Sequence, residues 1–405
     1  MTTAEELTNL FDSWVEPNGP VALHLKQKLL PVEGEGGVIF PPTYADIGYN
    51  IDTLSDGTKV ATIDSVGSQA NRMEPMFKST GKRKNHKGED EELNLLAALV
   101  PQVEIILNVK EPDGERYEKR QSLLDLAHRS ADAVVKATPS LAKIITPAFE
   151  ALNRHGNAGP LCAVAPTSLL FGVWDSRDGT GEKRPRLVRS IVRAWDVELM
   201  FSAAQFNSVW KSLDEASQSE LESAAKKAGK KRSETGFADA PAVFRKVSQS
   251  AAKHMTEFRN GSPNSERRTL GGVLTKGPIF RDVTVNLVAL RALRGVNSET
   301  DQIRKYLLSL ALLAASTELD LFLREGCLLR YADEQDVWNE VPRRGEPRRI
   351  TDFPKRDDLI KLATKLAEPF KERWPRDEKG KLALEHKFDL REAKRVASKK
   401  EEEEA

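Results

Sequence analysis

The chain has 405 residues, of which 39% are hydrophobic and 30% charged, and its formal net charge is +1. This length suffices for one large elaborated domain or two ordinary ones, and the composition is that of a soluble globular protein. A net charge near zero excludes a uniformly basic coat. It leaves room for a local basic face, because the two signs are segregated in blocks along the chain.

The sequence offers neither a disulfide framework nor a membrane segment. Its two cysteines, Cys162 and Cys327, lie far apart in apolar surroundings, which also argues against a zinc site. The first residues lack the basic and apolar regions of a signal peptide, and no run approaches the ~18 apolar residues of a transmembrane helix. We therefore expect a cytoplasmic protein without a membrane partner.

Periodicity and turn signals predict the elements of the first part of the chain. In chain order, we predict a helix over 4–14, a strand over 21–30, a turn-rich segment over 31–58, a strand over 60–63 that leads into a helix, a charged mobile loop over 78–90, a buried strand over 103–109 and a helix over 123–135.

In the second part, the apolar stretch 161–174 predicts a strand that ends in a turn. Residues 186–200 suit a helical face through Arg186, Arg189 and Arg193, but their β-branched residues favour a strand that completes a hairpin over 175–185. Further along, we predict a helical insertion over 202–258, a loop over 260–280, a strand over 283–290, a fully buried helix over 299–323, a strand over 327–331 and a charged end that frays from about 381.

Strands separated by helices and long polar loops predict an α+β fold, with helices on one face of an antiparallel sheet. A β-α-β-β-α-β arrangement is one member of this class. Periodicity alone does not select it.

A polar cluster follows the strand predicted over 60–63. Ser68, Gln69, Asn71 and Arg72 bring hydroxyl, amide and guanidinium groups together, and no acid occurs between them. Such groups suit a phosphodiester backbone. The alternative is a polar helix N-terminus capped by Ser65, with its amides in solvent.

Basic residues recur in or beside three turns, which can converge on one groove at a sheet edge. They are Lys82, Arg83 and Lys84; then Arg177, Arg184 and Arg186; then Arg268, Lys276 and Arg281. Few aromatic residues accompany them, so we expect contacts with a nucleic-acid backbone rather than base stacking. The alternative for each turn alone is a solvated charged loop.

The sequence predicts no catalytic residue, metal site or cofactor. Asp125, His128 and Asp132 have a helical spacing that could hold a metal, but a hydrogen-bonded structural network is the favoured interpretation. The segment 34–37 is a weak glycine loop that suits a hairpin turn better than a phosphate cradle.

Four segments, 64–74, 127–133, 168–176 and 189–197, resemble in content and order the CRISPR-associated RAMP protein that forms the crRNA-binding backbone of type I-G (formerly I-U) Cascade. Gly271-Gly272 and the segment from Pro278 to the strand over 283–290 resemble the later region of that family. The four residues of the polar cluster match the family's polar motif. The resemblance therefore implies that they contact RNA.

The resemblance also implies an RRM-like (ferredoxin-like) antiparallel sheet elaborated into a hand. The palm would comprise 1–201 and 259–380, with 202–258 as helical fingers and 381–405 as a charged tail. A β-hairpin thumb is expected at 31–60, which is longer and richer in turns than 260–280.

The function implied is that of a non-catalytic subunit in antiviral defence. Copies of the chain would oligomerise along CRISPR RNA with other Cascade subunits and hold the RNA backbone, so that its bases pair with target DNA. A filament of this kind needs two unlike faces, and we expect acidic 89–92 to meet a basic loop of the next copy.

Two other functions remain open on the sequence. An RNA endonuclease of the RAMP type would use His128 or His155 as general base, or Asp52 or Asp56 with a metal. A structural interaction protein without RNA is the third possibility.

Overall fold

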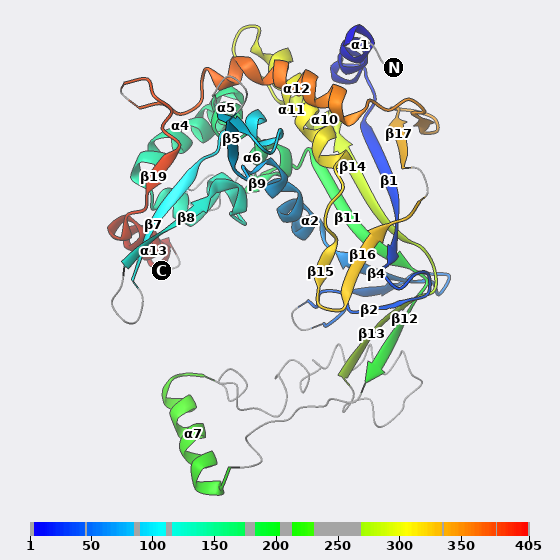
Figure 1. Ribbon diagram of the computed structural model, residues 1–405, viewed down its shortest axis with the longest axis vertical. Helices are drawn as coiled ribbons and strands as arrows, with labels where there is room; N and C mark the ends of the chain where they lie inside the picture. Colours follow the sequence, from blue (N-terminus) through cyan, green and yellow to red (C-terminus); the bar gives the residue numbers. More distant parts are fainter. Residues whose placement is uncertain are drawn as a thin grey trace.

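A curled antiparallel sheet lies at the centre of the computed structural model, and helices pack on one of its faces (Figure 1). The structure describes residues 4–44, 47–84, 90–110, 116–174, 183–202, 213–230, 269–333, 336–377 and 379–403. The strand order of this main sheet is β15 (Phe322–Arg324), β16 (Cys327–Tyr331), β1 (Ala22–Pro31), β14 (Ile279–Asn286), β11 (Val188–Trp195), β4 (Lys59–Asp64) and β3 (Ile51–Thr53). The predicted α+β class is confirmed.

The central pair of strands shows why the sheet has one helix-covered face. Residues alternate along β1 between buried and more exposed positions, and β14 does the same. The two strands pair from Ala22↔Asn286 to Leu29↔Ile279. The other edge of β1 is shared by β16 and by β17 (Val337–Val341), which also pairs with β18 (Arg348–Arg349). A period of two places one set of side chains under the helices and leaves the other set facing away.

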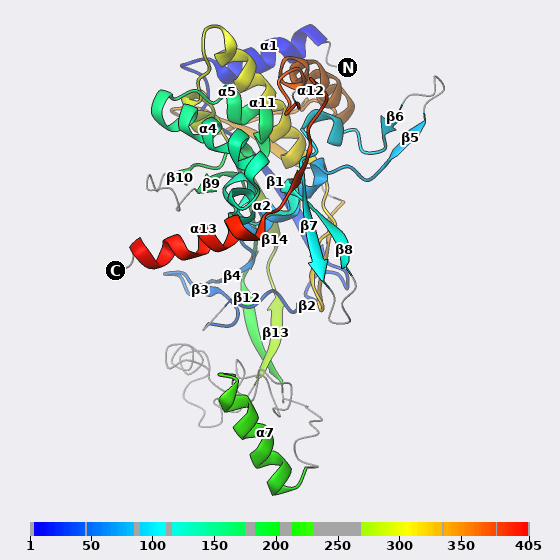
Figure 2. The ribbon, with the colours of Figure 1, turned by 90° about the vertical axis from the view of Figure 1, so that its left-hand side faces the viewer.

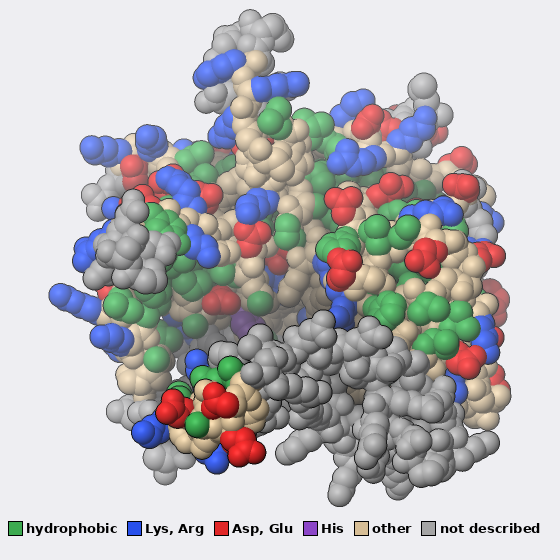
Figure 3. Space-filling model, turned by 60° about the horizontal axis from the view of Figure 1, so that its bottom comes forward, with side chains coloured by type: hydrophobic (Ala, Val, Ile, Leu, Met, Phe, Trp, Pro, Cys, Tyr) green, Lys and Arg blue, Asp and Glu red, His purple; other side chains and the backbone are tan. Residues whose placement is uncertain are grey.

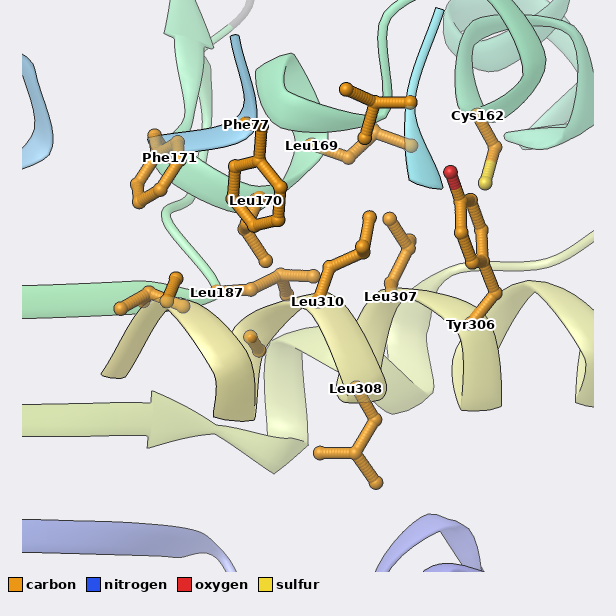
Figure 4. Close-up of a cluster of buried hydrophobic side chains, with 14 of the residues drawn as sticks. Phe77, Cys162, Leu169, Leu170, Phe171, Leu187, Tyr306, Leu307, Leu308 and Leu310 are labelled. Atoms are coloured by element: carbon orange, nitrogen blue, oxygen red, sulfur yellow. The ribbon is translucent and has the colours of Figure 1, made fainter. Parts of the chain in front are cut away.

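Helix α11 (Glu299–Ser316) lies at the middle of the core. Ile303 and every residue from Tyr306 to Ala315 are buried, as the apolar sequence predicts for a helix with neighbours on all sides. Figure 4 shows its Leu307 and Leu310 toward Leu169, Leu170 and Phe77, and its Tyr306 toward Cys162. The other helices around this core are α1 (Ala4–Val15), α4 (Pro139–His155), α5 (Gly159–Val164), α6 (Pro166–Phe171), α10 (Leu287–Ala292) and α12 (Arg356–Lys371).

The strand predicted over 161–174 is wrong. This stretch forms α5 and α6, each with a proline at its beginning, and only β9 (Val173–Trp174) is extended. Proline fits the first turn of a helix because its fixed φ is helical and its missing N–H has no partner there. Strand β9 pairs with β10 (Lys183–Arg184), so the hairpin lies there rather than between 161–174 and 186–200.

The helix predicted over 123–135 is also wrong. It is divided into two 3₁₀ turns, η3 (Leu123–Asp125) and η4 (Arg129–Ala131), and the short helix α3 (Ala133–Lys136). Arg129 has a positive φ of 53°, which is incompatible with a continuous right-handed helix.

A second hairpin continues the β11–β14 pair beyond the sheet. After β11 the chain forms β12 (Val197–Ser202), and β13 (Thr269–Thr275) returns to β14; the two pair from Val197↔Thr275 to Ser202↔Thr269. This hairpin projects from the sheet in both views (Figures 1 and 2). Helix α7 (Glu215–Lys227) is the described part of the intervening segment, and the rest of the predicted finger-like insertion lies outside the described residues.

The segment 31–60 takes part in two sheets, and its last strand, β3, forms a hairpin with β4 at the edge of the main sheet. Its β2 (Val38–Ile39) pairs with β13, and its β3 pairs with β4. Residues 269–275, predicted as part of a loop, are strand β13. The projecting hairpin is therefore β12–β13 rather than 31–60.

Smaller sheets flank the core. Strand β7 (Glu104–Lys110) pairs with β8 (Arg116–Ser122) and, in parallel, with β19 (Glu385–Lys387). Helix α13 (Leu390–Glu403) follows β19, so the expectation that the chain frays from 381 is wrong. Residues within the predicted mobile loop 78–90 contribute to a hairpin of β5 (Lys82–Lys84) and β6 (Asp90–Glu92).

The remaining predicted elements agree with the structure in type. They are the helix at the N-terminus, the strands β1, β4, β7, β11, β14 and β16, the helix after β4, and α11. Two of them end earlier than predicted: the strand over 283–290 stops at Asn286, before α10, and the helix over 299–323 stops at Ser316. In the described ranges, no helix combines the length and the apolar character needed to cross a membrane.

Candidate nucleic-acid interface

The polar cluster forms a short helix directly after β4. Ser65 is extended, and its hydroxyl accepts a hydrogen bond from the Ser68 backbone N–H at 3.3 Å, which caps helix α2 (Val66–Met73). The buried side of α2 consists of Gln69, Ala70 and Met73. Capping by Ser65 is confirmed, but the amide of Gln69 is inside the protein and not in solvent.

Gln69 lies at the centre of a buried polar network. Its Nε2 donates to Asp64 Oδ2 at 2.6 Å, and its Oε1 accepts from Ser190 Oγ at 2.7 Å and from Arg281 Nε at 3.3 Å. Gln69 is 0% exposed. Because each of its polar atoms is satisfied within the chain, Gln69 joins α2 to β4, β11 and β14.

Arg281 extends this network under α11. Its guanidinium donates to Gln27 Oε1, to the Ala315 carbonyl oxygen at 3.1 Å and to Met73 Sδ at 3.3 Å. The side chain is 0% exposed, and burial lowers the pKa of Arg281. The prediction that Gln69 and Arg281 face RNA is therefore corrected: neither side chain reaches the surface, because each completes the hydrogen bonding of the other.

Arg72 is also engaged within the chain. Its Nε donates to the buried Asp64 carboxylate at 3.1 Å, and its Nη1 and Nη2 donate to the carbonyls of Phe322 and Leu323 at 3.3 and 3.0 Å. The guanidinium thus joins α2 to strand β15 at the sheet edge. RNA contact by Arg72 stays a prediction, but the structure already gives this group three partners.

A second network lies on the other side of α2. Arg129 Nε is 2.6 Å from Glu74 Oε2, and both side chains are buried. Arg129 also donates to the Gly172 carbonyl and to Asn71 Oδ1, each at 3.2 Å. Burial raises the pKa of Glu74 to about 7, although the Arg129 charge opposes this shift.

Two serines complete this second network. Ser130 Oγ and Ser168 Oγ are 2.7 Å apart, and the Ser130 N–H donates to Ser168 Oγ at 3.3 Å. All four segments on which the resemblance rests therefore meet around α2. The segment 64–74 contacts 189–197 through Gln69 and Ser190, and it contacts 127–133 through Glu74 and Arg129.

The part of this assembly that faces solvent is small. We define the α2 surface as Ser68, which is half-buried, and Asn71 and Arg186, which are exposed. A Cβ at Gly172 would lie 2.8 Å from Arg186 Cγ, so the arginine stem covers that glycine. Burial and the nearby Arg129 charge lower the pKa of Arg186. Trp174, which follows Gly172 closely, is 51% exposed.

Two of the cations predicted in the turns, Lys82 and Lys276, form ion pairs within the chain. Lys82, Arg83 and Lys84 face Glu92, Glu91 and Asp90 across the β5–β6 hairpin, and Lys82 Nζ is 3.5 Å from Glu92 Oε1. The expectation that 89–92 meets a basic loop of another copy stays a prediction, although Glu92 already lies beside Lys82 of its own hairpin.

The other predicted cations are dispersed. Lys276 Nζ is 2.7 Å from Glu198 Oε2, and Arg184 Nη2 donates to Asn153 Oδ1. Arg177 and Arg268 lie outside the described residues. Figure 3 shows Lys and Arg side chains interspersed with Asp and Glu on the face that it presents.

The weaker metal and acid–base candidates do not come together. Asp125 pairs with Lys78, Asp132 accepts from the Val134 N–H as a helix cap, and His128 is exposed beside η4. Among the described residues, no group of three or more His, Cys, Asp or Glu side chains could hold a metal ion. The division of the predicted helix over 123–135 is the reason, because these three residues no longer share one face.

Sequence reasoning missed the importance of Glu74 and Arg129. A buried ion pair between residues 55 positions apart leaves no periodic signal. The one available sign was the concentration of polar residues in four otherwise apolar segments.

The family described as CRISPR-associated protein GSU0053 matches residues 23–199, just under half of the chain. The match includes all four segments that converge on α2, and it supports a CRISPR-associated protein. No curated protein matches the chain.

A chain from a solved structure described as "CRISPR RNA-guided surveillance complex, pre-nicking" is similar at 12% identity, over 93% of this chain and 99% of that chain, with a TM-score of 0.30. A TM-score this low carries no argument about the fold.

Proposed function

We propose that the protein is a non-catalytic, RNA-binding backbone subunit of a type I CRISPR effector complex, in which copies of the chain line up along the guide RNA. The observation that carries the proposal is the convergence on α2 of the four segments that resemble the RAMP backbone family. These segments lie within the region that matches a CRISPR-associated family.

The topology of the sheet supports an RRM-like core. Strands β16, β1, β14 and β11 are neighbours in this order. Helices lie between β1 and β11 and between β14 and β16, while β11 and β14 are joined through the projecting β12–β13 hairpin. This is the sequence of elements of a β-α-β-β-α-β unit. Under the proposal, the β12–β13 hairpin has the role of the thumb.

The chemistry of the α2 surface suits a subunit that holds RNA of any sequence. Ser68, Asn71 and Arg186 supply hydroxyl, amide and guanidinium groups, all of which can donate hydrogen bonds to phosphate oxygens. One buried network fixes α2 against the main sheet and the other fixes it against η4, so these groups are held by a rigid support. A grip on the backbone leaves base edges free to pair with target DNA.

The test measures binding of single-stranded RNA to the purified protein at several salt concentrations, with guide-length RNA of one sequence and of its scrambled form. We expect similar affinities for both sequences and a steep loss of affinity with salt, since phosphate contacts release counterions. Higher-order species should form as the RNA is lengthened. A monomer on long RNA in low salt, or a strong preference for one sequence, would contradict the proposal.

A pair of variants locates the contact. Arg186→Ala removes an exposed cation of the α2 surface, and Lys365→Ala removes an exposed cation of α12. Loss of a charge-assisted contact is worth about 1.5–3 kcal/mol, so Arg186→Ala should weaken RNA binding roughly tenfold or more while Lys365→Ala leaves it unchanged. Equal effects of both variants would remove the α2 surface from the proposal.

The same binding reactions distinguish an RNA-binding backbone subunit from an RNA endonuclease. RNA recovered from the binding assay should keep its full length with and without added divalent metal. If the RNA is cleaved, and if His128→Ala or Asp52→Ala abolishes that cleavage, the protein is an RNA endonuclease and the backbone proposal fails.

A further inference from the structure

The face of the main sheet that points away from the helices carries cations on β1 and β11, among other strands. On β1, Leu23, Leu25, Gln27 and Leu29 are buried, and the alternate residues His24, Lys26 and Lys28 are more exposed. The period of a strand places these alternate residues on the face opposite to Gln27. Phe280, Asp282 and Thr284 occupy the same face of β14, and Arg189 and Arg193 occupy that face of β11.

The register aligns these residues in rows across three strands. Lys28 and Arg193 are both opposite Phe280, Lys26 and Ile191 are both opposite Asp282, and His24 and Arg189 are both opposite Thr284. Neighbouring strands are about 4.8 Å apart. Each row therefore brings a β1 side chain and a β11 side chain to the two sides of β14.

The charges of this face leave an excess of cations. His24 Nε2 is 3.3 Å from Asp282 Oδ1, and Lys28 Nζ is 3.2 Å from Glu35 Oε1. Lys26 Nζ lies 3.8 Å from the centre of the Phe280 ring, in a cation–π contact. No carboxylate of the described residues forms an ion pair with Lys26, Arg189 or Arg193. We call these three residues the open-face cations.

The open-face cations are separate from the α2 surface. Helix α2 packs on the opposite face of the sheet, where Gln69 contacts Ser190 of β11 and Arg281 of β14. The buried polar network therefore lies between the two surfaces. One short strand of nucleic acid cannot contact both without passing around an edge of the sheet.

We propose that this open face is a second nucleic-acid site, which binds the phosphodiester backbone of a single strand lying across β1, β14 and β11. The cations flank the strand, and Thr284 offers a hydroxyl between them. Phe280, at the centre of one row, offers a ring that a base can contact when Lys26 turns to a phosphate. The cations can bind either a nucleic acid or an acidic peptide. The aromatic ring favours nucleic acid, because a base can stack on it, whereas an acidic peptide would use only the charges.

The test uses the full-length protein and labelled oligothymidylate and oligouridylate of about eight nucleotides, a length within the range that one small domain binds. Lys26→Ala, Arg189→Ala and Arg193→Ala are combined in the Arg186→Ala background, so that the α2 surface is already weakened. The matched control combines Lys361→Ala, Lys365→Ala and Lys394→Ala, three exposed cations of α12 and α13, in the same background. Both proteins have the same net charge.

We expect the open-face variant to bind the oligonucleotides at least tenfold more weakly than the control. The slope of log K against log salt should fall in magnitude by about 2, because each phosphate contact in a single strand contributes about 0.7. Equal affinities and slopes for the two variants would overturn the proposal. Weak binding by Arg186→Ala alone, with no further loss in the open-face variant, would leave the proposed function standing and remove this site.

A second measurement identifies the class of ligand. Phe280→Leu keeps the charges and removes the ring, and it should weaken oligonucleotide binding but not binding of polyglutamate. If polyglutamate competes as strongly as the oligonucleotides and Phe280→Leu affects neither, the open face binds acidic protein and the proposal of a nucleic-acid site fails.

Discussion

Replacing Arg72 by Ala should lower the stability of the protein rather than its affinity for RNA. The substitution removes the donor to Asp64 and the donors to the carbonyls of Phe322 and Leu323. Asp64 is 1% exposed and would keep Gln69 as its remaining side-chain donor. Strand β15 would lose its tie to α2, while the α2 surface itself would keep all its groups.

The magnitude follows from these contacts. A hydrogen bond to a charged group contributes about 1.5–3 kcal/mol, and the carbonyl bonds add less because the Arg72 side chain is partly solvated. We expect a loss of about 2–4 kcal/mol. An unfolding entropy of about 2.1 cal/mol/K per residue over 405 residues converts this loss to a decrease in Tm of about 2–5 °C.

The assay is thermal unfolding followed by circular dichroism, together with RNA binding at a temperature well below Tm. Lys365→Ala is the control, since an exposed substitution should change stability by no more than about 0.5 kcal/mol. An Arg72→Ala protein with the Tm of the wild type and weakened RNA binding would refute the reasoning. It would show that the guanidinium leaves Asp64 to bind RNA.

Three further predictions concern the buried groups. Burial raises the pKa of Glu74 from 4.5 to about 7, so the protonated carboxyl stabilises the folded state fully below pH 4.5, and this contribution is lost as pH rises from there through 7. Glu74→Gln should therefore flatten the dependence of Tm on pH between 4.5 and 7. A pH profile of Tm unchanged by the substitution would contradict the raised pKa. Gly172 has φ 78° and ψ 150° and tight neighbours, whereas Gly57 has φ 86° and open space; urea unfolding should show a loss of about 1 kcal/mol for Gly57→Ala and a larger loss, about 2–3 kcal/mol, for Gly172→Ala, and the reverse order would be inconsistent with the geometry. Burial raises the pKa values of Cys162 and Cys327, the latter to about 12, so neither thiol should react with Ellman's reagent before the protein unfolds, and rapid labelling of the native protein would count against this.

Elements with one dominant local signal could be predicted from the sequence. Helix α11 is apolar on all sides, and β1 alternates with a period of two, so each has one consistent interpretation. The apolar stretch that forms α5 and α6 was compatible with two interpretations, a helix and a strand. A short buried helix and a buried strand have the same composition, and the prolines at the helix starts were the signal that decides between them.

Features that depend on distant partners could not be predicted. Strand β19 forms because β7, 281 positions earlier by the pairing of Glu385 with Glu104, offers a parallel edge. Gln69 and Arg281 are polar and look like surface residues, yet each satisfies the other in the interior. The sequence indicated correctly that the polar cluster matters, but polarity alone does not distinguish a residue that binds RNA from one that orders the core.

The paired ends of β12 and β13 have a consequence for how this protein can vary. At the far end of the projecting hairpin, Ser202 and Thr269 are partners in one ladder. The paired strands already hold the two ends of the connecting segment together. Lengthening that segment therefore costs only about 0.6 kcal/mol of loop-closure free energy for each doubling of its length. The connecting segment can be lengthened, exchanged or reduced to a tight turn while the sheet, both buried networks and the open face persist. We therefore expect related chains to differ in length most readily at this point.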